Sequence, residues 1–125
     1  MHKSKLKDLH TLREFAWFWM NVYKCHNVIP FYNFKDGVYL GIALQDMGFE
    51  MDCGESYCEK FGTKEIPDLA TLKRQLPDMD IQLLGNLIFS QWRYWNHWSD
   101  YEIMEEKDYD WFVAAFERLV ELSNH

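Results

Sequence analysis

The chain has 125 residues, a formal net charge of −7, and a composition that is 48% hydrophobic and 18% aromatic. This length is typical of one domain, and the ring-rich composition excludes intrinsic disorder. The negative charge repels phosphate backbones and anionic lipid, so neither direct nucleic-acid binding nor membrane binding is expected.

The first predicted helix covers about residues 4–24, with Ser4 as its N-cap. Leu9, Leu12 and Tyr23 follow a helical period, and Phe18 widens this apolar face so that the helix should contact neighbours on two sides. The most apolar early run, residues 15–20, is far too short to cross a membrane. No membrane span is therefore expected.

Residues 27–34 read as a connector because Pro30 disfavours helical geometry in the residue before it. A second helix follows over about residues 38–47, and Gly48 stands where a C-terminal glycine ends a helix. Residues 49–67 lack sustained periodicity, which predicts a long irregular loop that either holds a short helix near residues 56–61 or has a functional role.

Asp68 is predicted to cap a helix over residues 69–76, which Pro77 ends. Two further helices are predicted, over about residues 80–98 and 107–123. No strand-like alternation of convincing length occurs. The chain is therefore expected to form a single all-α domain over residues 1–125, with four to five helices and one long irregular loop at about residues 49–67.

The segment SQWRYWNHW, residues 90–98, continues two helical stripes. The apolar stripe, which includes Leu84, Ile88 and Trp95, predicts core. The second stripe is polar, and its members are Gln82, Asn86, Ser90, Arg93 and His97. It is either the solvent face of the helix or the floor of a groove, in which case Asn86, Arg93 and His97 would bind a small molecule or an anion.

Four residues could form a tetrahedral metal site on paper, namely Cys25, His26, Cys53 and Cys58. The chain has no tight CxxC or HxxxH pair, so free thiols are expected and no metal or other cofactor is predicted. Three cysteines and no apolar leader before a cleavage site predict a cytoplasmic protein. No catalytic sequence motif is present, and a non-enzymatic role is favoured.

Acidic residues are densest at positions 100–110, with six acids and one lysine. A surface of this charge favours a protein partner with a basic surface. The predicted contact residues are Tyr101, Glu102, Glu105, Glu106 and Tyr109. The two tyrosines are expected to be exposed docking residues.

In general character, small acidic ring-rich chains of this kind resemble the accessory and anti-defence proteins of phages and mobile elements. This resemblance, which no motif carries, implies an accessory, regulatory or anti-defence protein-interaction module. The alternative is a small-molecule or anion-binding protein, or a modest enzyme, that uses the polar groove. The aromatic excess also allows homodimerisation, because rings beyond what the core holds become surface contacts.

Overall fold

Six α-helices and no strand occur among residues 6–25, 34–98 and 104–124, which are the residues that the computed structural model describes. The helices are α1 (Leu9–Lys24), α2 (Phe34–Asp46), α3 (Glu55–Phe61), α4 (Leu69–Gln75), α5 (Ile81–Arg93) and α6 (Glu106–Leu122). A 3-10 turn, Leu76–Asp78, follows α4, and a π-helical turn, Tyr94–Trp98, continues α5. The all-α prediction is confirmed, as is the short helix within the irregular segment.

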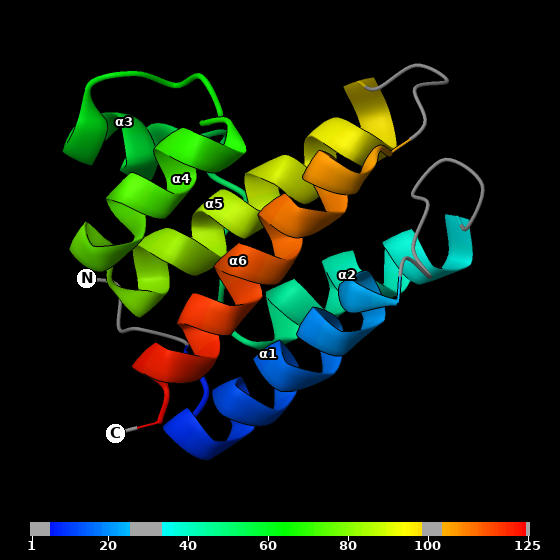
Figure 1. Ribbon diagram of the computed structural model, residues 1–125. Helices are drawn as coiled ribbons and strands as arrows, with labels where there is room; N and C mark the ends of the chain where they lie inside the picture. Colours follow the sequence, from blue (N-terminus) through cyan, green and yellow to red (C-terminus); the bar gives the residue numbers. More distant parts are fainter. Residues whose placement is uncertain (1–5, 26–33, 99–103, 125) are drawn as a thin grey trace.

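Helices α1 and α6 form the most extensive contact and lie side by side. Helix α5 packs against α2, α3 and α6, while α3 and α4 gather at one end of the molecule (Figure 1). No helix in the described part of the chain has the length and apolar character that crossing a lipid bilayer requires.

Aspartate side chains begin three of the helices. The backbone N–H groups of Thr11, Thr71 and Leu83 each donate to an aspartate three residues earlier, at 2.8 Å. These bonds satisfy amides that have no partner within the helix. Asp68 is thus the predicted cap of α4, whereas α1 begins at Leu9 behind Asp8, so the prediction of a start at Ser4 is wrong.

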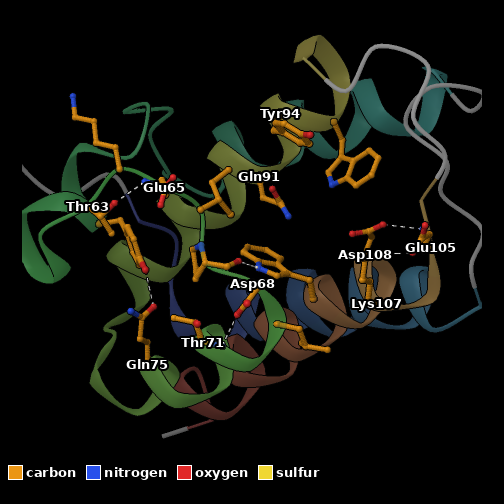
Figure 2. A pocket seen from close by; sticks show the side chains of 17 residues that line it. Thr63, Glu65, Asp68, Thr71, Gln75, Gln91, Tyr94, Glu105, Lys107 and Asp108 are labelled. Atoms are coloured by element: carbon orange, nitrogen blue, oxygen red, sulfur yellow. Dashed lines mark hydrogen bonds and ion pairs between the residues drawn. The ribbon is translucent and has the colours of Figure 1, made fainter.

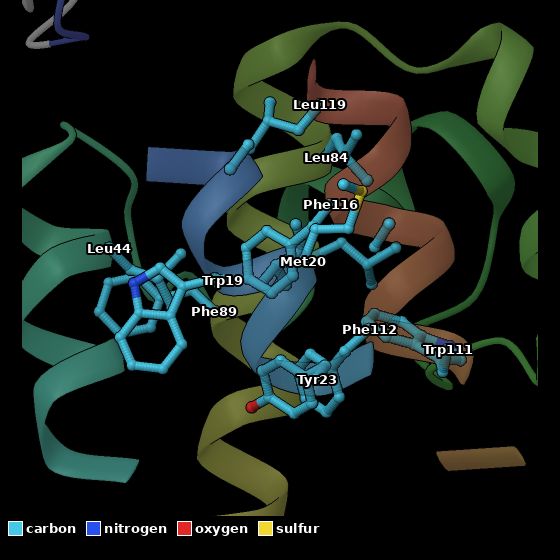
Figure 3. Packing of buried hydrophobic residues seen from close by; sticks show 14 of the residues in the cluster. Trp19, Met20, Tyr23, Leu44, Leu84, Phe89, Trp111, Phe112, Phe116 and Leu119 are labelled. Atoms are coloured by element: carbon cyan, nitrogen blue, oxygen red, sulfur yellow. The ribbon is translucent and has the colours of Figure 1, made fainter. Parts of the chain in front are cut away.

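The core combines aliphatic side chains with rings, many of which come from α1 and α6 (Figure 3). Tyr23 stacks on Phe112 with ring centroids 4.3 Å apart, and Phe15 meets Phe116 edge to face at 5.9 Å. Such ring pairs stabilise beyond the area that they bury. The expected burial of Phe18 is wrong, because that side chain is 56% exposed on the outer surface of α1.

Helix α5 is enclosed on all sides over residues 83–91, every one of which is buried. Its glycine, Gly85, allows a close approach, since a Cβ there would stand 2.0 Å from Cδ1 of Phe49. The predicted core residues Leu84, Ile88 and Trp95 are confirmed as buried. A helix so enclosed has no solvent face over these residues. Polar side chains that are enclosed there must therefore find hydrogen-bond partners inside the protein.

The Tyr23 hydroxyl is fully buried and has no hydrogen-bond partner among the described residues. A buried hydroxyl without a partner costs about 1–3 kcal/mol of desolvation. We therefore expect Tyr23→Phe to raise the free energy of unfolding by about 1 kcal/mol, measured by urea denaturation. A loss of stability in this variant would show that the hydroxyl is satisfied in solution.

The same substitution has a pH signature. Burial raises the pKa of Tyr23 far above its ordinary value. The unfolded chain then releases this proton near pH 10 while the folded protein keeps it, so stability falls as pH rises above about 10. Tyr23→Phe should lose less stability than the parent protein between pH 9 and 11, and an identical alkaline decline would contradict this assignment.

Candidate functional site

The polar stripe of α5 is buried at its centre. Asn86 is 4% exposed, and its side-chain oxygen accepts hydrogen bonds from the Glu50 N–H at 2.8 Å and from Gln82 Nε2 at 2.9 Å. Its side-chain nitrogen donates to Asp52 Oδ2 at 3.3 Å. Ser90 is also buried, and its hydroxyl donates to the Asn86 carbonyl at 3.1 Å. The centre of the stripe is therefore neither a solvent face nor the floor of a groove. Its side chains form hydrogen bonds that join α5 to the loop before α3.

The Arg93 side chain lies on the same loop. Arg93 is half-buried, and its Nη1 donates to Met51 Sδ at 3.6 Å. The backbone of His97 belongs to the π-helical turn, and its side chain lies outside the described part of the structure. Because the groups of Asn86 are used inside the fold, the predicted ligand set of Asn86, Arg93 and His97 gains no support from this geometry.

The cysteines are free thiols. Cys25 and Cys53 are exposed, and Cys58 is half-buried. Among the described residues, no three histidine, cysteine, aspartate or glutamate side chains come together in a way that could hold a metal ion. His26, the fourth residue of the hypothetical metal set, lies outside the described residues.

The acidic segment divides into residues with different environments. Glu105 and Glu106 are exposed where α6 begins, as a docking surface requires. Tyr109 is only 4% exposed, so the prediction that its ring is exposed is wrong. Its position in the second turn of α6 points it into the core beside Tyr23, with ring centroids 6.3 Å apart. Tyr101 and Glu102 lie outside the described residues.

A cleft of about 1120 Å³ opens beside Glu105 (Figure 2). Its walls come from the connection between α3 and α4, from α4, from the end of α5 and from the start of α6. Two hydrogen bonds hold these walls together. Trp111 Nε1 donates to the Pro67 carbonyl at 2.8 Å, and the Tyr57 hydroxyl donates to Gln75 Oε1, also at 2.8 Å. The cleft therefore rests on side chains that are fixed by the fold.

Aromatic side chains line the deep part of this cleft. Trp95 and Trp111 are buried, whereas Tyr94 is half-buried and is the most accessible of the three rings. The Tyr94 and Trp95 rings meet nearly at right angles, with centroids 5.6 Å apart. Rings of this kind offer an apolar surface that also attracts cations.

Four carboxylates and two lysines also line the cleft. The carboxylates are Glu65, Asp68, Glu105 and Asp108, and the lysines are Lys64 and Lys107. Lys107 Nζ lies 3.8 Å from Glu105 Oε2, so one of the two amines is already next to an acid. The cleft is therefore acidic overall.

Two of these carboxylates are positioned by the ends of helices. The Thr71 N–H donates to Asp68 Oδ1 at 2.8 Å and lowers the pKa of that carboxyl. The Glu105 N–H donates to Asp108 Oδ2, also at 2.8 Å. Each group keeps a second oxygen that can accept a hydrogen bond from a ligand.

Gln91 is the one strongly buried amide among the residues that line the cleft. It is 9% exposed, and its side chain forms no hydrogen bond with the residues that the structure describes. Figure 2 shows this side chain pointing from α5 into the space on whose far side Asp68 and Asp108 lie. The amide is thus available to whatever occupies the cleft.

Sequence reasoning identified Glu105 but missed Gln91, Glu65, Trp95 and Trp111 as cleft residues. The residues concerned are spread from position 57 to position 111, and no spacing pattern connects them. One signal was available in Gln91, a polar residue on a face of α5 opposite to the recognised polar stripe. Comparison with family models, curated proteins and solved structures gave no match to this chain.

Proposed function

We propose that the protein is a non-enzymatic interaction module that binds a basic segment of a partner protein in the cleft beside α6. The observation that carries this proposal is the acidic, ring-lined cleft itself, with four carboxylates against two lysines. Glu105 belongs both to this cleft and to the acidic segment of residues 100–110, so the cleft gives that segment a concave site.

The chemistry of the cleft favours cationic side chains. Its carboxylates attract them, and the half-buried ring of Tyr94 adds an aromatic surface against which a cation can lie. The net charge of −7 steers a basic partner toward the protein before docking. An accessory or regulatory role, in which the module covers a basic surface of its partner, follows from this mode of binding.

We place the module in the cytoplasm. Two of its three cysteines are exposed as free thiols, Cys25 and Cys53. Exposed unpaired thiols persist in a reducing compartment and are oxidised outside it. Alkylation of living cells before lysis tests this placement. If Cys25 or Cys53 is already oxidised and does not react with the alkylating reagent, the protein resides in an oxidising compartment.

Calorimetric titration with capped hexa-arginine and hexa-lysine peptides tests the proposed function. We expect at least one peptide to bind with a stoichiometry of one per chain, and to bind more weakly as salt rises. Glu65→Lys reverses one charge at the cleft and should weaken binding about fivefold, since an exposed charge pair contributes up to about 1 kcal/mol.

Glu117→Lys is the matched control, because Glu117 is exposed on α6 outside the cleft. This variant has the same net charge as Glu65→Lys, and we expect it to bind nearly as well as the parent protein. An equal loss in both variants would show that peptides are held by net charge alone. That result, or no binding of either peptide, would refute the proposal.

A further inference from the structure

The side-chain amide of Gln91 opens onto the cleft and makes no hydrogen bond within the described part of the protein. Most of the Gln91 side chain is held in place by the fold, while its amide is left to bind water or a ligand in the cleft. Gln91 is 9% exposed, forms no hydrogen bond with the described residues, and lines the acidic cleft. A ligand in the cleft can therefore replace the water on this amide without disturbing a hydrogen bond of the fold.

The surroundings of this amide restrict the chemistry of that ligand. Asp68 and Asp108 line the same cleft and repel an anion. Rings of Tyr94, Trp95 and Trp111 line it as well, and they favour a flat cationic group. The ligand group should therefore be positive and planar, with hydrogen-bond donors for the Gln91 carbonyl oxygen.

We infer that the cleft selects arginine over lysine and that Gln91 is the residue that determines this specificity. This inference rests on the proposed function, because it names the anchor of the basic segment. A guanidinium carries five donors in one plane, so it can donate to the Gln91 oxygen and to a carboxylate while its face lies on a ring. A lysine ammonium is compact and strongly hydrated, and it lacks this plane.

Gln91→Leu tests the inference, because leucine nearly preserves the volume of the side chain and removes the amide. In the parent protein we expect hexa-arginine to bind about tenfold more tightly than hexa-lysine, a difference of one good charged hydrogen bond. In Gln91→Leu, arginine binding should fall toward the lysine value while lysine binding stays unchanged. Gln91→Met serves as a second variant if the leucine form folds poorly.

Gln45→Leu is the matched control, since Gln45 is exposed on α2 and does not line the cleft. It should keep the full preference for arginine. A preference that survives in Gln91→Leu, or that is absent in the parent protein while both peptides bind, would overturn the inference and leave the proposed function standing. Failure of both peptides to bind the parent protein would instead remove the proposed function and this inference with it.

Discussion

Replacing Gly85 by alanine is expected to lower the free energy of unfolding by about 1–2 kcal/mol. An added methyl group would stand 2.0 Å from Cδ1 and 2.1 Å from Cε1 of the Phe49 ring. Overpacking a filled core costs about 1–3 kcal/mol, occasionally more, and here it outweighs the gain of about 1 kcal/mol in helix propensity. Phe49 cannot move aside freely, because it packs against Phe15 with ring centroids 6.3 Å apart. Urea denaturation measures this effect.

The double variant Gly85→Ala with Phe49→Leu separates the collision from other effects of the substitution. Leucine is smaller than phenylalanine, so the added methyl group should cost less in the double variant than in the single one. A coupling of about 1 kcal/mol in this cycle is expected for residues in contact. A rise in stability on Gly85→Ala alone would mean that α5 and the loop before α3 are not so closely packed.

Asn86→Leu is expected to lower the free energy of unfolding by about 2–3 kcal/mol. The substitution leaves the Glu50 N–H without its partner, and it removes one of the two donors to Asp52 Oδ2, which keeps the hydrogen bond from the Ser56 N–H. Each partly buried group that loses its partner costs about 1–3 kcal/mol, and hydration of the more exposed groups recovers part of this cost. Thermal and urea unfolding of the variant provide the measurement.

Ser90→Ala is a suitable comparison for Asn86→Leu, since the Ser90 hydroxyl donates only to a carbonyl of its own helix. We expect it to cost less than about 1 kcal/mol. If Asn86 instead serves a ligand, Asn86→Leu will retain its stability and lose only binding. The two interpretations of the polar stripe of α5 are thus separated by one unfolding curve.

Local signals in the sequence predict most of the helices. Asp68 and Asp80 cap helices. An aspartate directly before a stretch with apolar residues at helical spacing is a strong signal for a helix N-terminus, because its carboxylate accepts a backbone hydrogen bond there. The first helix was placed too early, since both Ser4 and Asp8 are good caps and only the fold selects between them. Phe18 was misplaced for a related reason, because helical period does not say how wide the contacted face is.

The character of α5 could not be derived from its own sequence. Its polar stripe looks like a solvent face, and only the packing of other helices around it shows that Asn86 and Ser90 are enclosed. The cleft poses the same difficulty, because Glu65, Gln91 and Trp111 come from three segments that meet only in the folded protein. Sites assembled from distant segments leave no spacing pattern to read.

The contact between α1 and α6 also governs how the protein can be made. On the ribosome, Lys24 at the end of α1 emerges long before Glu106 at the start of α6. At about 5–20 residues per second, synthesis of the chain between them takes roughly 4–16 s. During this interval the rings of α1 that are buried in the folded protein have no α6 to pack against, so the nascent chain exposes aromatic side chains to solvent. The rings of α1 can therefore reach their buried positions only after α6 has been synthesised, so this central contact of the fold forms late.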